Sequence, residues 1–135
     1  MAETTRFGVS IDAALLQDFD VLCTSHGYAN RSEAVRDLMR DALERHAVAH
    51  GDVETAGTLT LIYDHQKNDV VQKLAAAQHH APVHLITALL VHLGPDTCLE
   101  VLVMRGQGRL IHDFAQKLRA IKGVVHGKLS LTGML

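Results

Sequence analysis

The first fifty residues contain one strand pattern and two helix patterns that cannot enclose a hydrophobic core by themselves. From Thr5 to Ile11 apolar and polar residues alternate, which predicts a strand with one buried face. Apolar residues at helical spacing then follow between Asp12 and Gly27 and again between Asn30 and Gly51. The strand has no pairing partner in its own chain, and each helix has an uncovered apolar stripe. We therefore expect a second copy of the chain to complete this core.

Two copies would pair their strands as an antiparallel ribbon over four helices. This is the ribbon-helix-helix arrangement, in which the ribbon enters the major groove of DNA. Arg6 and Ser10 would then face base edges, where arginine suits guanine and a hydroxyl can meet several bases. The helix start at Asn30, Arg31 and Ser32 is suited to hold a phosphate. The alternative interpretation is that Arg6 and Ser10 are only the solvated side of an edge strand.

The charge of this half is unusual for a DNA-binding unit. Residues 1–50 contain five arginines, no lysine and eight acidic residues, which gives a net charge of −3. General attraction to phosphate is therefore weak, and DNA binding would depend on a few placed groups.

Neither a targeting signal nor a membrane segment is predicted. The N-terminus lacks the basic and apolar parts of a signal peptide. The apolar run over residues 83–93 is shorter than the roughly 20 residues that cross a bilayer. The two cysteines, Cys23 and Cys98, do not form a disulfide framework. We expect a cytoplasmic protein with no membrane partner.

The second half of the chain has the pattern of an α+β sandwich. Strand patterns occupy residues 58–63, 83–93, 97–104 and 124–131, and helix patterns occupy 67–77 and 110–121. The order βαββαβ predicts a ferredoxin-like fold. The fold class is therefore α+β, with a ribbon-helix-helix domain over 1–50 and a ferredoxin-like domain over 51–135.

The predicted hairpin in this domain carries a histidine and a cysteine at matching positions. If the turn is Gly94-Pro95-Asp96, His92 faces Cys98, and their Cβ atoms lie about 5 Å apart. Imidazole and thiolate together form a soft ligand set for a transition metal. Glu100 would lie opposite Leu90, diagonal to His92, where its carboxylate could accept the second imidazole N–H.

Each of the two hairpin faces is apolar, and we expect the helices to cover the one with Leu89, Val91 and Leu93. The opposite face, with His92 and Cys98, would then meet another copy of the chain. Cys98 and His92 could also serve as nucleophile and base of an enzyme. No oxyanion hole or substrate pocket is evident, so we expect no enzymatic activity.

Several stretches spread over the chain resemble the family of nickel-responsive repressors, NikR. They are GYANRSEAVRD (27–37), YDH (63–65), QHH (78–80), VH (91–92), DTCLE (96–100) and GVVHG (123–127). The resemblance implies a ribbon-helix-helix domain joined to an ACT-like metal-binding domain. It also implies a tetramer, built as a dimer of dimers, that represses transcription at a palindromic DNA operator.

The resemblance also implies roles for particular residues. His92 and Cys98 match two nickel ligands of one subunit, and His79 matches a ligand donated by a neighbouring subunit. Glu100 matches an acid beside the metal. Glu33 and Asp37 match a second cation site found in some members. Arg6 and Ser10 match strand positions that read DNA.

The chain departs from the family at Leu90, where the pattern His-x-His has become Leu-Val-His. Leucine cannot bind a metal, so the implied ligand set is incomplete. Nickel could bind weakly, zinc or copper could bind instead, His80 or His84 could replace the ligand, or the site could be inactive. Another alternative is a DNA-binding regulator whose ACT-like domain senses a small organic molecule.

Overall fold

The computed structural model describes residues 3–133, which form two compact units. The first unit runs to Ala42 and the second begins at Leu43, and each is described by itself. The predicted functional boundary near residue 50 stays a prediction.

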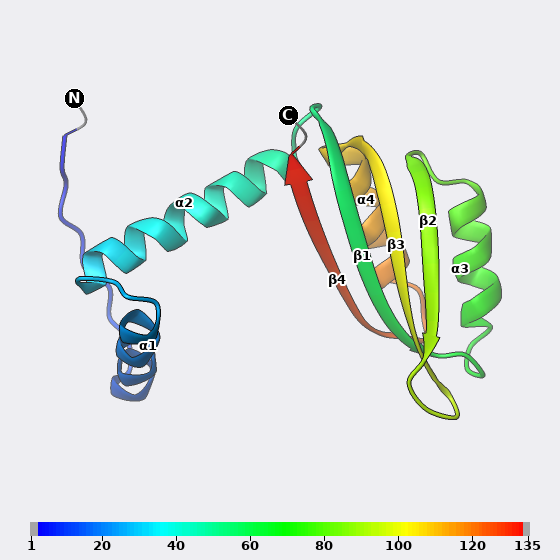
Figure 1. Ribbon diagram of the computed structural model, residues 1–135, viewed down its shortest axis with the longest axis horizontal. Helices are drawn as coiled ribbons and strands as arrows, with labels where there is room; N and C mark the ends of the chain where they lie inside the picture. Colours follow the sequence, from blue (N-terminus) through cyan, green and yellow to red (C-terminus); the bar gives the residue numbers. More distant parts are fainter. Residues whose placement is uncertain (1–2, 134–135) are drawn as a thin grey trace. The chain divides into compact units, whose positions relative to one another are not determined.

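The first unit contains helix α1 (Ala13–Ser25) and most of helix α2 (Arg31–Ala49) (Figure 1). Both helices begin with a side-chain cap. Asp12 Oδ1 accepts the N–H of Leu15 at 2.8 Å, and Asn30 Oδ1 accepts the N–H of Glu33 at 2.9 Å. Gly27, at a φ of 74°, lets the chain turn between the two helices. The two predicted helices are confirmed.

The segment before α1 pairs with no strand in the described part of this chain. Its apolar side chains are exposed, with Phe7 at 67% and Val9 at 69% of their full accessible surface. Leu15 and Leu38 on the two helices are also exposed, and Cys23 and Ala34 are the buried apolar residues described in this unit. The predicted strand is thus absent from the single chain, because no second strand is present to form its ladder.

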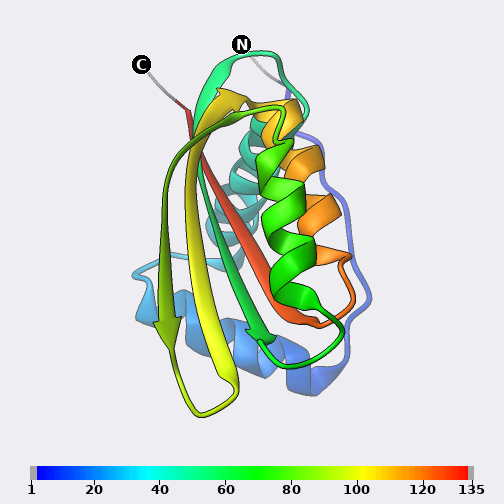
Figure 2. The same cartoon turned by 90° about the vertical axis from the view of Figure 1, so that its right-hand side faces the viewer.

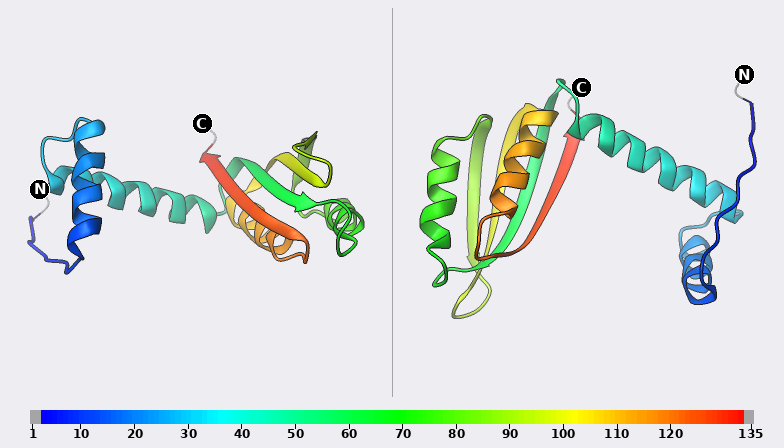
Figure 3. Two further views of the ribbon diagram at one scale, coloured as in Figure 1. Left: turned by 90° about the horizontal axis from the view of Figure 1, so that it is seen from below. Right: turned by 180° about the vertical axis from the view of Figure 1, so that it is seen from behind.

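The second unit is a four-stranded antiparallel sheet with two helices on one face (Figures 2 and 3). The strands lie in the order β2-β3-β1-β4. The elements are β1 (Glu54–Asp64), α3 (Val70–His79), β2 (His84–His92), β3 (Thr97–Gln107), α4 (Gly108–Arg119) and β4 (Val124–Gly133). This is the predicted βαββαβ fold.

The helices cover the face of the sheet opposite to the one predicted. The fully buried residues of the hairpin are Cys98, Leu102 and Met104, whereas Leu89 is 60% exposed. Alternation showed that the hairpin has two faces, but both are apolar. The chain crosses from β1 through α3 to the parallel strand β2, and the right-handed sense of this crossover decides which face α3 covers. The alternation of residues within the hairpin contains no information about this crossover.

Among residues 3–133, no helix has both the length and the apolar character needed to cross a membrane.

Candidate metal centre

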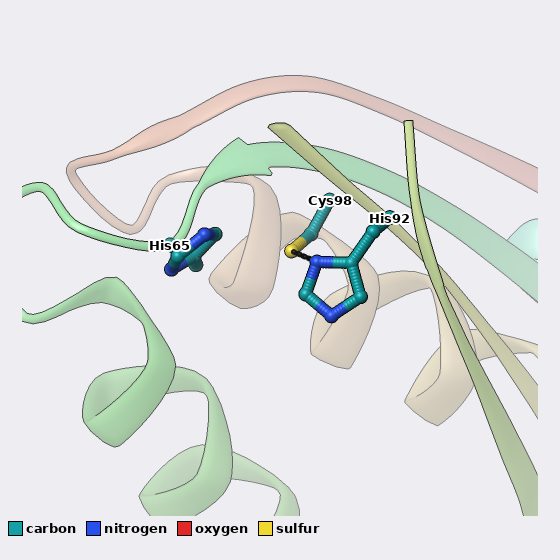
Figure 4. Close-up of side chains that lie close together, drawn as sticks. All are labelled: His65, His92 and Cys98. Atoms are coloured by element: carbon teal, nitrogen blue, oxygen red, sulfur yellow. Dashed lines mark hydrogen bonds between the residues drawn. The ribbon is translucent and has the colours of Figure 1, made fainter. Parts of the chain in front are cut away.

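The β2–β3 hairpin brings an imidazole and a thiol together at its closed end. His92 and Cys98 are directly paired, as predicted, and the turn between them is closed by the N–H of Leu93 donating to Thr97 O at 2.8 Å. Cys98 Sγ lies 3.5 Å from His92 Nδ1 (Figure 4). Cys98 is buried, whereas the His92 side chain is exposed.

A second histidine, His65, completes a group of three potential metal ligands. One ligand atom from each of His65, His92 and Cys98 lies within 4.8 Å of the other two (Figure 4). His65 directly follows β1, whose last residue, Asp64, pairs with Thr97. The end of β1 and the closed end of the hairpin are therefore neighbours.

The spacing of these atoms is compatible with binding to one ion. Zinc–sulfur bonds are about 2.3 Å and zinc–nitrogen bonds about 2.0 Å. Two such ligands on one ion lie about 3.0 Å apart at a right angle and about 3.5 Å apart at the tetrahedral angle. The 3.5 Å between Cys98 Sγ and His92 Nδ1 falls at this separation. The residues present thus fit a transition metal with modest side-chain adjustment.

The three residues line a cavity of about 330 Å³ between the sheet and α3. Apolar walls come from Val71, Leu74 and Ala75 of the helix. Leu90 also lines this cavity, and its hydrocarbon side chain cannot bind a metal as the family's histidine would.

Glu100 makes two hydrogen bonds at the edge of the cavity, and neither involves His92. The hydroxyl of Tyr63 donates to Glu100 Oε2 at 3.0 Å, and Gln78 Nε2 donates to Glu100 Oε1 at 2.9 Å. Glu100 does lie opposite Leu90, as predicted. Burial, followed by the neighbouring Glu100 charge, raises the pKa of Tyr63 well above its usual range.

The other candidate histidines lie outside this group. His79 ends α3 and packs edge-to-face on His80, with ring centroids 5.0 Å apart. His84 pairs with Arg105, and an irregularity between Leu85 and Thr87 shifts the alternation of β2. His84 therefore lies on the uncovered side of the sheet, which rules it out as the replacement for Leu90 within its own chain.

The predicted DNA-contacting residues lie in the first unit. Arg6, Arg31 and Ser32 line a groove of about 970 Å³ between the N-terminal segment and α2. Ser10 is exposed, and the Asn30 side chain caps α2. Arg31 forms a two-pronged ion pair with Asp20, at 2.7 and 2.8 Å.

Glu33 and Asp37, the candidates for a second cation site, are one turn apart on α2. Asp37 Oδ1 forms an ion pair with Arg40 at 3.2 Å. A hydrogen bond to Asp37 is also the main cause of a raised pKa at Tyr28.

His65 is the cavity residue that was not predicted as a ligand. Two sequence signals pointed to it: its membership in a cluster of five histidines within 28 residues, and its place directly after a strand. The missing information was the antiparallel register of β1 against β3, which brings the ends of distant segments together.

Comparisons with known proteins identify the family of the chain. Residues 56–132 match the family described as NikR C terminal nickel binding domain. A relative from Nitratidesulfovibrio vulgaris, named "Putative nickel-responsive regulator", is 52% identical over 132 residues, which cover 98% of this chain and 95% of the relative. A relative of the same name from Geobacter sulfurreducens is also 52% identical, and one from Thermococcus kodakarensis is 46% identical over 128 residues.

The fold also has a solved neighbour. The ACT domain from GTP pyrophosphokinase of Chlorobium tepidum superposes with a TM-score of 0.52 at 13% identity, covering 58% of this chain and all of that domain. This likeness concerns the fold alone. The family match over most of the second unit and the relatives over nearly the full length together show that the chain belongs to the NikR family of nickel-responsive regulators.

Proposed function

We propose that this chain is a nickel-responsive repressor that binds a palindromic DNA operator as a homotetramer, a dimer of dimers, in the cytoplasm. The observation that carries the proposal is the pair of Cys98 Sγ and His92 Nδ1, 3.5 Å apart at the closed end of the hairpin in a nickel-binding family domain. A thiolate and an imidazole favour nickel, copper or zinc over calcium or magnesium.

The proposed nickel site uses His92 and Cys98 of one subunit and His79 of a neighbouring subunit. His79 lies at the end of α3, where its position beside His80 leaves it outside the cavity of its own chain. When bound, nickel would supply cationic charge that bridges two subunits. Glu100, held by Tyr63 and Gln78, would keep a negative charge beside the ion.

The proposed tetramer needs two kinds of contact, and each unit offers an uncovered apolar surface. In the first unit, Phe7 and Val9 belong to the segment that would form the ribbon with a second copy. In the second unit, the face of the sheet with Leu89, Val91 and Leu93 is not covered by the helices. The second apolar contact is thus proposed on this face, because the helices cover the face of Cys98.

In the proposed DNA complex, Arg6 and Ser10 would read bases from the ribbon, and the start of α2 at Asn30, Arg31 and Ser32 would contact phosphate. Arg31 would exchange its exposed ion pair with Asp20 for a phosphate, and such exposed pairs contribute little stability. Glu33 and Asp37 remain a proposed second cation site.

The test is a comparison of operator binding by nickel-loaded and chelated protein at one stated salt concentration. The operator is first selected from random duplexes with nickel-loaded protein. Nickel is expected to tighten binding by about 5- to 150-fold, the usual range of coupling between two sites. Cys98→Ser is expected to bind the same duplex without a nickel effect, because it lacks the thiolate.

Equal affinity of the loaded and chelated proteins would contradict the proposal. A nickel-independent response to an organic molecule that fits the 330 Å³ cavity would instead favour a small-molecule sensor. Arg6→Ala separates base reading from phosphate contact: it is expected to lose about 1–3 kcal/mol of discrimination at one base pair.

A further inference from the structure

We propose that His65 is a third nickel ligand from the same chain as His92 and Cys98, and that it compensates for the missing donor at Leu90. The inference rests on the proposed nickel site and identifies how this particular chain completes it. It is carried by the convergence of three ligand atoms within 4.8 Å from two separate parts of the sequence.

Two hydrogen bonds hold His65 against the turn that positions the other two ligands. Its backbone N–H donates to Asp96 O at 3.0 Å, and its ring Nε2 lies 3.1 Å from Pro95 O. Pro95 and Asp96 are in the turn that joins His92 to Cys98. The ring is therefore positioned relative to the hairpin before any ion arrives, which lowers the entropy cost of binding.

The hydrogen bond to Pro95 also selects a tautomer that suits metal binding. A carbonyl oxygen can only accept a hydrogen bond, so Nε2 of His65 must carry the proton. The lone pair of the neutral ring is then on Nδ1. Metal-bound histidines commonly donate their other ring N–H to a backbone carbonyl or a carboxylate, and His65 already makes such a contact.

The other polar groups of the cavity are already paired with one another. Tyr63 and Gln78 both donate to Glu100, and Leu90 has no ligand atom. Outside the His92–Cys98 pair, His65 is thus the lining residue that has an imidazole to offer a metal. One thiolate and the neighbouring carboxylate of Glu100 would together balance the two charges of a divalent ion, while two neutral imidazoles complete the same-chain set.

The experiment is a nickel titration of the full-length protein, in which the thiolate-to-nickel absorption band and the affinity against a competing chelator are measured. X-ray absorption then counts the imidazoles bound to nickel. The test variant is His65→Gln, because an amide can still donate to Pro95 O but lacks an imidazole. The matched control is His84→Gln, which removes a histidine from the uncovered side of the sheet.

His65→Gln is expected to weaken nickel binding by at least about ten-fold and to lower the imidazole count by one. His84→Gln is expected to bind like the original chain. Adding Leu90→His to His65→Gln is expected to restore affinity, because Leu90 lines the same cavity and a histidine there supplies a new imidazole.

Three results would overturn the inference, and they are distinguishable. An unchanged affinity and imidazole count in His65→Gln would show that His65 is no ligand, while the proposed function stands. A weakened affinity with an unchanged imidazole count would show that His65 only positions the hairpin. Absence of a Cys98-dependent band in the original chain would remove the proposed nickel site itself, and this inference with it.

Discussion

Glu100 shows how much of the site is decided by contacts between single side chains. Its two carboxylate oxygens accept hydrogen bonds from β1, through Tyr63, and from α3, through Gln78. A carboxylate held by two donors keeps a fixed orientation beside Cys98 and Leu90. The same arrangement disfavours ionisation of Tyr63, because a tyrosinate would be buried beside a negative charge.

The raised pKa of Tyr63 leads to a prediction about alkaline pH. In Tyr28→Phe, Tyr63 is the sole tyrosine, and its tyrosinate absorbance is expected to appear only well above the usual pKa of about 10. Because the pKa of Tyr63 is higher in the folded than in the unfolded chain, the contribution of the neutral phenol to folding stability is complete below about pH 10. It is then lost as the pH rises toward the folded-state pKa.

The control for this prediction is Glu100→Gln in the same background, which removes the negative charge beside the phenol. The pKa of Tyr63 is expected to fall but to stay above its usual value, because burial is the largest cause of the shift. A normal titration of Tyr63 in the folded Tyr28→Phe protein would contradict the structure.

At the scale of elements, the last residues of α2 pack tightly against the start of α4. The N–H of Gly108 donates to Val53 O at 3.2 Å, and the N–H of Arg109 donates to Gly51 O at 2.9 Å. A Cβ added at Gly108 would lie 1.9 Å from Val48 O, far inside contact distance. Glycine is therefore required here by close backbone approach.

Gly108→Ala is expected to destabilise the second unit by about 1–3 kcal/mol, since the backbone must move to accept the methyl group. The measurement is thermal unfolding of the metal-free chain. Gly94→Ala is the matched control, because a Cβ at Gly94 meets no atom within 4 Å. Equal unfolding temperatures for the two variants would show that the backbone between α2 and α4 can move without loss of stability.

At the scale of the whole molecule, the first unit depends on another copy for its core. Apolar side chains of the N-terminal segment and of both helices are exposed in the single chain, with Phe7 and Val9 the clearest cases. A unit with so little buried apolar surface has little hydrophobic stabilisation of its own. Association and folding of this half should therefore be linked.

This linkage predicts the effect of one added charge. Val9→Lys is expected to convert the proposed tetramer into a smaller species, because the lysine would be buried in the ribbon interface. Ser10→Lys adds the same charge on the opposite face of the segment and should leave the assembly intact. The mass of each variant's assembly is measured by sedimentation or light scattering. A Val9→Lys protein that keeps the mass of the original assembly would contradict a ribbon interface.

The amino-acid sequence by itself determined the features that depend on local periodicity and local hydrogen bonds. The caps at Asp12 and Asn30 and the pairing of His92 with Cys98 follow from residues a few positions apart. The sequence also indicated that the first unit cannot close its core alone, because alternation and helical spacing show apolar faces without partners.

Only the tertiary structure decided which side of the sheet is covered and which groups share the cavity. Leu102 and Met104 are buried and Leu89 is exposed because a crossover connection selects one face, although both faces are apolar. His65 joins His92 and Cys98 because β1 ends beside the hairpin turn, some thirty residues away along the chain. Such contacts depend on strand order and register across the sheet, and no local pattern in the sequence encodes them.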